Sequence, residues 1–319
     1  MMDRGKQQAL HYLARTAAAL ALAVLLACLL APLVYNGLVV VGQHWDGWSR
    51  LETLRFGRVV SRVFLLSFVG FLFLALRHRG DGHVMLPGLR RCTGWRAMLG
   101  RGFLIGIATV GLTVAVVVMG GGLVWAPPVW TRWVPRIATY LIGALLIGWL
   151  EELFFRGMLF GWARRLAPWG VVAVGISLFF SWVHFISPPS PQVVDYVHWF
   201  DGFRVLPRLV DTSEAFDYYW PFALNLFLIG MVLSTWYQRD GHLWGVIGIH
   251  AGWVWMLRTS RLFLDRNPEV MTWWWGPSSN VGRSGWTTVM LVAMWIWALC
   301  RHPVPAAAVD QKAEGGRAC

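Results

Sequence analysis

The sequence predicts an all-α, polytopic membrane protein, a bundle of about eight transmembrane helices. Of its 319 residues, 57% are hydrophobic and only 14% are charged, whereas soluble domains carry about 25% charged residues. The apolar residues form long continuous runs without the alternation that a membrane β-barrel requires. The runs cover residues 16–41, 59–76, 102–125, 137–162, 171–186, 221–237, 243–257 and 285–300.

The first three runs are delimited by charge and proline. Run 16–41 follows a basic N-terminus, is too long for a signal peptide and lacks a small-residue cleavage site, so we expect a retained span. Run 102–125 follows a basic segment, 77–101, and ends before Pro127, because proline cannot donate to a helix ladder.

The later runs have similar limits. Arg164 and Arg165 close run 137–162, and a proline-rich stretch, 187–191, ends the fifth run. Two long connections, 192–220 and 258–284, are rich in aromatic residues, as expected for segments that rest at the membrane interface. The polar tail after run 285–300 has the composition of a disordered segment.

The distribution of arginines predicts the orientation. Eight spans place both termini on one side, together with segment 77–101 and the pair Arg164 and Arg165, and the positive-inside rule assigns that side to the cytoplasm. These topology-determining arginines account for the net charge of +12. The chain has no basic soluble segment of the kind that binds nucleic acid. The arginine-rich, lysine-poor composition indicates a bacterial protein of the inner or plasma membrane.

We divide the chain into three segments within one bundle. Residues 1–136 carry the first three helices and the basic cytoplasmic loop. Residues 137–257 carry helices four to seven, which hold most of the polar groups inside spans. Residues 258–319 carry an outer loop, the last helix and the tail.

The fourth run contains two adjacent glutamates and an arginine within apolar sequence. Ionisable groups inside a membrane cost ~2.5–3.5 kcal/mol each on insertion scales and usually have a function. Glu152 and Arg156 are four residues apart, so they lie on one helix face and can pair. Glu151 lies about 140° round the helix from Arg156 and is poorly placed for the same pair. Glu152 therefore suits a structural role, and Glu151 suits a general base acting on water.

Two histidines lie in other runs. Phe180 and His184 are four residues apart in the fifth run, so the ring can pack against the imidazole. His250 lies in the seventh run among small residues that allow close helix approach, Gly248, Ala251 and Gly252. A lone membrane histidine is usually a satisfied core group, and a lone Glu–Arg pair is usually structural. Five costly groups on three spans favour a functional site instead.

These residues resemble three motifs of the CAAX protease and bacteriocin-processing family of intramembrane glutamic endopeptidases. The first is Glu151-Glu152-x-x-x-Arg156, and the second is Phe180-x-x-x-His184. The third is His250, preceded by Leu-Trp-x-x-Ile-Gly-Ile. The resemblance covers about residues 137–256. It implies hydrolysis of a peptide bond in a membrane-associated peptide or protein.

The resemblance also implies roles for single residues. Glu151 would act with His184 to hold and activate a water, and His250 would stabilise the oxyanion. Glu152 and Arg156 would support the site. The family usually has an asparagine four residues after the last histidine, where this chain has Val254. Another donor would have to replace it, and we expect Asn225 in the sixth run.

Alternative functions and cofactors are kept open. No cofactor is expected; two glutamates and two histidines could ligate zinc, but no His-Glu-x-x-His pair is present. Val254 favours an inactive binding or immunity protein of the same fold as an alternative. A proton-coupled transporter is a second alternative, because buried carboxylates can relay protons. Eukaryotic relatives trim prenylated C-termini, and bacterial relatives are linked to peptide maturation or self-immunity, so the substrate is open.

Overall fold

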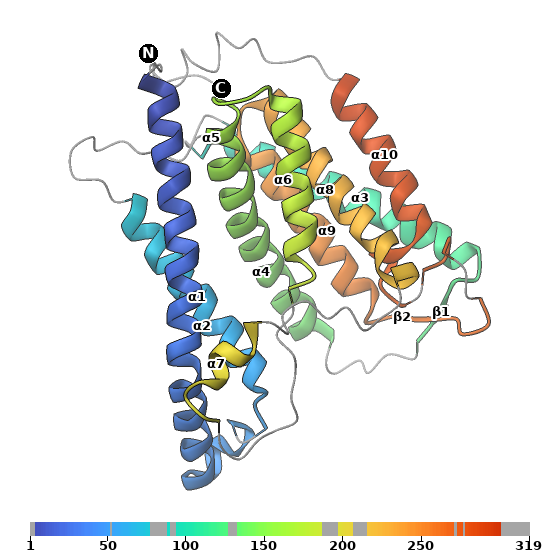
Figure 1. Cartoon of the computed structure of the whole chain (residues 1–319). Helices are drawn as coiled ribbons and strands as arrows, with labels where there is room; N and C mark the ends of the chain where they lie inside the picture. Colours follow the sequence, from blue (N-terminus) through green and yellow to red (C-terminus); the bar gives the residue numbers. More distant parts are fainter. Residues whose placement is uncertain are drawn as a thin grey trace. The chain divides into compact units, whose positions relative to one another are not determined.

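The computed structural model shows a mainly helical chain, with a small two-stranded sheet in its described part (Figure 1). Each of the eight predicted runs contains a helix, which confirms the fold class. The structure describes residues 4–51, 53–76, 88–89, 94–126, 133–186, 197–206, 216–270, 273–276 and 278–300. The predicted disordered tail lies outside these ranges.

The elements follow one another along the chain with these bounds. The α-helices are α1 (Arg4–His44), α2 (Phe56–Leu76), α3 (Trp95–Met119), α4 (Trp133–Glu152), α5 (Gly161–Ala163), α6 (Trp169–Val183), α7 (Asp201–Arg204), α8 (Phe216–Asp240), α9 (Leu243–Ser260) and α10 (Gly285–Cys300). The other elements are the 3₁₀-helices η1 (Asp46–Leu51) and η5 (Val281–Arg283), the π-helix η3 (Leu153–Phe160), and the strands β1 (Leu123–Trp125) and β2 (Leu264–Arg266).

Several helices have the length and composition of membrane spans. Within the described residues these are α1, α2, α3, α8 and the continuous helix Trp133–Ala163 that α4, η3 and α5 form together. Helices α6 and α10 are apolar but shorter. The chain is therefore a multi-pass membrane protein, as predicted. Helix α1 begins twelve residues before the predicted run. The more polar segment from Arg4 to Arg15 is also helical, and hydropathy alone could not detect this part of the helix.

The chain divides into two compact units. The first comprises Met1–Val84 with Trp182–Glu214, and the second comprises Met85–Ser181 with Ala215–Cys319. The units interleave along the chain, whereas the predicted segments 1–136, 137–257 and 258–319 are consecutive. The predicted division into three segments, with the functional residues in 137–257, remains a prediction.

The first unit is built on the antiparallel pair α1 and α2. Its core includes Tyr35 and Phe56, whose rings meet edge to face at 5.5 Å. The Asn36 side chain donates to the Val197 carbonyl at 2.7 Å and accepts from the Val197 amide at 3.0 Å. A side chain at Gly202 would collide with the Cys28 carbonyl, so α7 packs directly on the α1 backbone.

These contacts place one described stretch of the connection 192–220. Residues 197–206 pack against α1 at positions inside the run 16–41. The Asn36 amide satisfies the backbone of Val197, which makes an irregular segment acceptable there. That the connection rests at the membrane interface remains a prediction.

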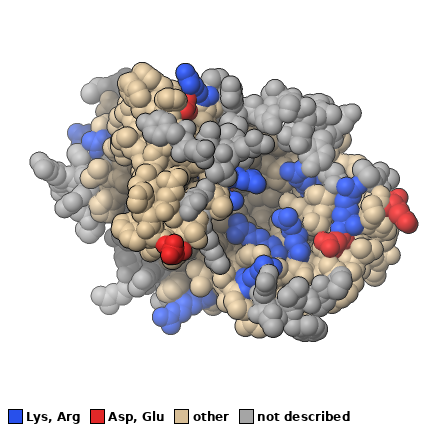
Figure 2. Space-filling model, turned by 90° about the horizontal axis from the view of Figure 1, so that it is seen from below, with Lys and Arg blue, Asp and Glu red and all other residues tan. Residues whose placement is uncertain are grey.

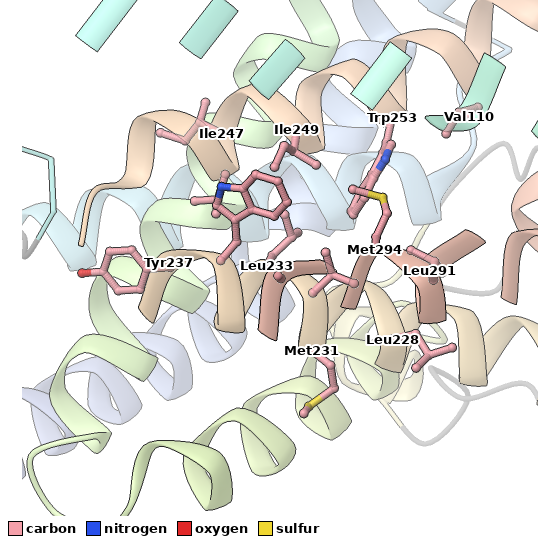
Figure 3. Packing of buried hydrophobic residues seen from close by; sticks show 14 of the residues in the cluster. Val110, Leu228, Met231, Leu233, Tyr237, Ile247, Ile249, Trp253, Leu291 and Met294 are labelled. Atoms are coloured by element: carbon pink, nitrogen blue, oxygen red, sulfur yellow. The ribbon is translucent and has the colours of Figure 1, made fainter. Parts of the chain in front are cut away.

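The second unit is organised around α9. This helix is buried continuously from Gly245 to Trp253. Figure 3 shows its side chains Ile249 and Trp253 among Leu233 of α8, Met294 of α10 and other apolar residues. The functional helix α9 therefore lies inside the unit, with little surface of its own.

Glycines allow α3 and α9 to approach closely. A Cβ at Gly248 would collide with the Leu99 carbonyl oxygen, and one at Gly252 would collide with that of Phe103. Gly102 and Gly106 of α3 meet α9 in the same way. The predicted close approach at Gly248 and Gly252 is confirmed, since only residues without a Cβ fit between two helix backbones at this distance.

Replacing Gly248 with alanine is expected to lower the free energy of unfolding by about 1–3 kcal/mol or more, because backbone must move to admit the methyl group. Gly175 of α6 is the matched control, since a Cβ there meets nothing within 4 Å. Thermal melting of the purified protein in detergent measures both variants. Equal melting temperatures for the two would show that the close α3–α9 contact is not required.

The predicted end of the third run, at residue 125, is wrong. Residues 123–125 form strand β1, which pairs antiparallel with β2 from Leu123↔Arg266 to Trp125↔Leu264. Helix α3 ends at Met119 because Gly120 and Gly121 follow, the latter with a φ of 75°. The Asn267 amide donates to the Gly121 carbonyl at 2.8 Å. This two-stranded sheet thereby joins the end of α3 to the segment after α9.

Candidate active site

The acidic stretch lies at a change in helix type. α4 ends at Glu152, and the eight residues Leu153–Phe160 continue as a π-helix before the α-helical turn α5. π-Helical segments inside α-helices are rare and are frequent at functional sites. No sequence signal predicted this segment.

The predicted pair is present and fully buried. Arg156 Nη1 donates to Glu152 Oε1 at 2.8 Å, and both side chains are 0% exposed. Arg156 Nη2 also donates to the Gly230 carbonyl of α8 at 3.4 Å. Gly230 lies where α8 meets α6, since a Cβ there would be 2.6 Å from the Ser177 side chain. The pair therefore links the α4–η3 junction to α8.

His250 also contacts the Glu152–Arg156 pair, and the sequence did not predict this contact. Its Nδ1 lies 2.6 Å from Glu152 Oε1, the same oxygen that accepts from Arg156. We assign the proton to Nδ1, because a carboxylate can only accept. Glu152 is thus shared by Arg156 and His250, whereas the sequence analysis gave it Arg156 alone. The tight contact of Gly148 with Ala251 (3.1 Å from a Cβ at Gly148 to the Ala251 amide nitrogen) sets the register of α4 against α9.

The second ring nitrogen of His250 faces the other glutamate. His250 Nε2 lies 3.8 Å from Glu151 Oε2. The Glu151 side chain is 31% exposed, whereas that of His250 is 7% exposed. The two glutamates therefore differ in environment, because Glu152 is fully enclosed and the Glu151 side chain is partly exposed.

Aromatic rings enclose the buried side of the network. The Arg156 guanidinium lies 4.8 Å from the centre of the Phe180 ring and 5.8 Å from that of Phe155. Phe180 also meets the His250 ring edge to face, with centroids 6.3 Å apart. This apolar surround strengthens the electrostatic interactions among the charged groups.

His184 has a different setting from the one expected. Helix α6 ends at Val183, so His184 lies in the following turn and its side chain is exposed. It belongs to the first compact unit, whereas Glu151 and His250 belong to the second. The structure therefore gives no geometry between His184 and Glu151, and both its water-holding role and its contact with Phe180 remain predictions.

Asn225 has structural partners. Its Nδ2 donates to the carbonyls of Gly282 (3.0 Å) and Ser284 (3.2 Å), and its Oδ1 accepts from Thr288 (2.6 Å). Both amide hydrogens are thus engaged, and the residue ties α8 to η5 and α10. The geometry does not support the expectation that Asn225 replaces the asparagine missing at position 254. Val254 itself is half-buried one turn after His250 on α9.

A metal site is not formed by the described part of the chain. There, no three His, Cys, Asp or Glu side chains are grouped so as to hold a metal ion. Cofactor independence remains a prediction, and addition of a chelator to active protein tests it.

Comparison with known proteins gives one match. Residues 131–256 match the family model of type II CAAX prenyl endopeptidase Rce1-like proteins. This segment contains Glu151, Glu152, Arg156, His184 and His250. No curated protein and no solved structure matches the chain.

Proposed function

We propose that this chain is an intramembrane endopeptidase, because its residues 131–256 match the family model of type II CAAX prenyl endopeptidase Rce1-like proteins. Its substrate would be a membrane-associated peptide or protein. The observation that carries the proposal is the Glu151–His250–Glu152–Arg156 network, which brings a partly exposed glutamate beside a buried, oriented imidazole.

Glu151 would act as the general base. Its side chain is partly exposed, and its Oε2 lies 3.8 Å from His250 Nε2. It would take a proton from a water molecule as that water attacks the peptide carbonyl carbon. It would then give the proton to the leaving amine as the carbon–nitrogen bond breaks, so that no net proton is consumed.

His250 would stabilise the oxyanion. Glu152 holds Nδ1–H and thereby fixes the orientation of the ring. An imidazolium also donates from Nε2, which points toward the Glu151 side of the network. A preorganised donor aimed at a developing oxyanion is worth about 2.7–4 kcal/mol of barrier. Arg156 and Glu152 act as positioning residues, since they reach the reacting atoms only through His250.

Introducing asparagine at Val254 is expected to raise kcat by about tenfold or more, since one well-placed oxyanion donor is worth ~10²–10³-fold. Position 254 is one turn from His250 on the same face of α9. Val254→Ala removes the same side chain without adding a donor and should give no increase. An equal effect of both changes in a cleavage assay would show that steric relief, and not hydrogen bonding, limits the reaction.

A cleavage assay tests the proposed function. Purified protein in liposomes is incubated with a randomised library of N-acylated peptides, and mass spectrometry identifies the products. We expect discrete cleavage by wild type and none by His184→Ala if His184 helps to hold the water. Indistinguishable products from wild type, Glu151→Gln and His184→Ala would contradict the proposal.

A catalytically inactive binding or immunity protein is the second candidate, and Val254 is the observation that favours it. In that case wild type binds a peptide without cutting it. Peptides recovered intact with the purified protein, together with no cleavage even by Val254→Asn, would support this alternative.

A further inference from the structure

The segment 197–206 contacts α1 at two levels. The Asn36 side chain is hydrogen-bonded to both backbone groups of Val197, at 2.7 and 3.0 Å. Five residues later, a Cβ at Gly202 would collide with the Cys28 carbonyl oxygen. Asn36 and Cys28 are eight residues apart, which is about 12 Å along an α-helix. The segment therefore runs lengthwise along α1, and Figure 1 shows α7 lying beside that helix.

The contact at Gly202 lies in the middle of the apolar part of α1. Cys28 is at the midpoint of the apolar run 16–41, and α1 contains a window of mean hydropathy 2.7. The hydrocarbon core of a bilayer is ~30 Å thick, so it extends about 15 Å to each side of its middle. A membrane centred on this run places Cys28 near the bilayer centre and Asn36 near the edge of the hydrocarbon core. The segment 197–206 would then enter the membrane from the Asn36 level and reach its interior.

The exposed side chains of this segment change in kind along its length. Trp199 and Phe200 are exposed, and their ring centroids are 3.7 Å apart. They lie on the shallow part of the segment, and aromatic side chains are common at the edge of a membrane. Arg204 Nη1 donates to Asp201 Oδ1 at 2.9 Å, and the Arg204 side chain is 72% exposed. A charged, exposed pair thus flanks the deeper contact at Gly202.

Lipid is a poor surrounding for such a pair. Irregular backbone at membrane depth occurs only where protein buries it or where it lines a water-filled cavity. Charged side chains inside a membrane cost ~2.5–3.5 kcal/mol each on insertion scales, and they usually face a polar interior or water. Uncharged residues dominate the described surface in Figure 2, so an exposed ion pair is not typical of this chain. The exposure of Arg204 at this level therefore calls for water beside it.

We propose that residues 197–206 form a re-entrant segment, and that its Asp201–Arg204 side lines a water-filled recess within the membrane. Asn36 anchors the segment, because its amide satisfies both backbone groups of Val197 where water becomes scarce. Water and other small hydrophilic molecules would reach the bilayer interior along this side. The inference goes beyond the proposed function, since it concerns the first compact unit and does not depend on hydrolysis.

A position of the Arg204 backbone in lipid is the competing explanation. The arginine stem is long enough to hold its charged end toward the membrane surface while the backbone lies in lipid. Cysteine at position 204 has no such stem, so its reactivity reports the surroundings of the segment itself. Thiol reagents attack the thiolate, and apolar surroundings suppress the thiolate. A cysteine in a water-filled recess should therefore react, and one in lipid should not.

Cysteine labelling in membranes tests the proposal. Arg204→Cys is made in the full-length protein with serine in place of Cys92, Cys300 and Cys319. Open membrane fragments, which expose both membrane faces, are treated with a charged, membrane-impermeant maleimide. The protein without an added cysteine gives the background from Cys28, which is buried.

Two further cysteines provide the reference rates. Leu33→Cys is the matched control, since Leu33 is exposed on α1 between the levels of Cys28 and Asn36. Trp48→Cys is exposed in η1, beyond the end of α1, and gives the rate outside the span. We expect the cysteine at position 204 to react about tenfold or more faster than that at position 33, because the thiolate needs water. Its rate should lie within a factor of about three of the rate at position 48.

Two results would overturn the proposal. Equally slow reaction at positions 204 and 33 would show that the segment faces lipid or protein. Equally fast reaction at both would show that α1 does not lie in hydrocarbon at this level. Exposed ion pairs contribute about 0–1 kcal/mol, so Arg204→Cys should melt close to wild type. The double variant Asp201→Asn/Arg204→Cys removes the remaining carboxylate charge and supplies the rate if the single variant does not fold.

Discussion

Glutamine in place of Glu151 is expected to lower kcat by about 10²–10⁴-fold, the contribution of a general base. The amide keeps the size of the carboxylate but cannot take a proton from water. Because the Glu151 side chain is partly exposed, the change should leave the melting temperature close to that of wild type. Peptide binding should also persist, so the loss should appear in kcat and not in KM.

The control for this prediction is Glu269→Gln. Glu269 is an exposed residue outside the helices that form the site, and its replacement should leave kcat unchanged. Turnover by Glu151→Gln within a factor of three of wild type would show that another group activates the water.

Methionine in place of Arg156 is expected to lower the free energy of unfolding by about 3–5 kcal/mol, the cost of breaking a buried ion pair. Arg156 and Glu152 are both 0% exposed, so Glu152 would keep a buried charge with only His250 beside it. Denaturant titration in detergent measures the loss. Activity should also fall, because Glu152 would no longer hold His250 in place.

Two further variants test the reason for this loss. Arg204→Met removes an arginine from an exposed pair with Asp201, where Arg204 is 72% exposed, and pairs of this kind contribute about 0–1 kcal/mol. The double variant Glu152→Gln/Arg156→Met removes both buried charges and should recover much of the stability. A double variant less stable than Arg156→Met alone would show that the lost charge balance is not the cause.

Local spacing predicted the parts of the site that lie on one helix. The Glu152–Arg156 pair follows from their separation by four residues, and the structure confirms it at 2.8 Å. The fold class could be predicted because long apolar runs are incompatible with a soluble or barrel fold. The motif pattern indicated the family of CAAX proteases, and residues 131–256 match a family model of that kind.

Contacts between distant segments could not be predicted in the same way. The bond from His250 to Glu152 depends on the register of α9 against α4, which the close packing of Gly148 on Ala251 sets. Asn225 looked available because its acceptors lie in a connection some sixty residues later. The two-stranded sheet of β1 and β2 joins segments that are likewise remote in sequence.

Helix ends were the least predictable local feature. Val183 closes α6 one residue before His184, although the apolar composition continues to Ile186. The π-helix after Glu152 has no composition signal either, since Leu153–Phe160 is as apolar as the helix before it. In both places the backbone conformation next to a proposed catalytic residue could not be predicted from apolar composition.

Incorporation of heavy oxygen tests the central claim most directly, namely that Glu151 activates a water that hydrolyses a peptide bond. A peptide cut by wild type is incubated in H₂¹⁸O with wild type or Glu151→Gln, and the new carboxyl group is analysed by mass spectrometry. We expect one ¹⁸O atom in the product of wild type and no product above background from Glu151→Gln. Equal amounts of labelled product from both proteins would contradict it.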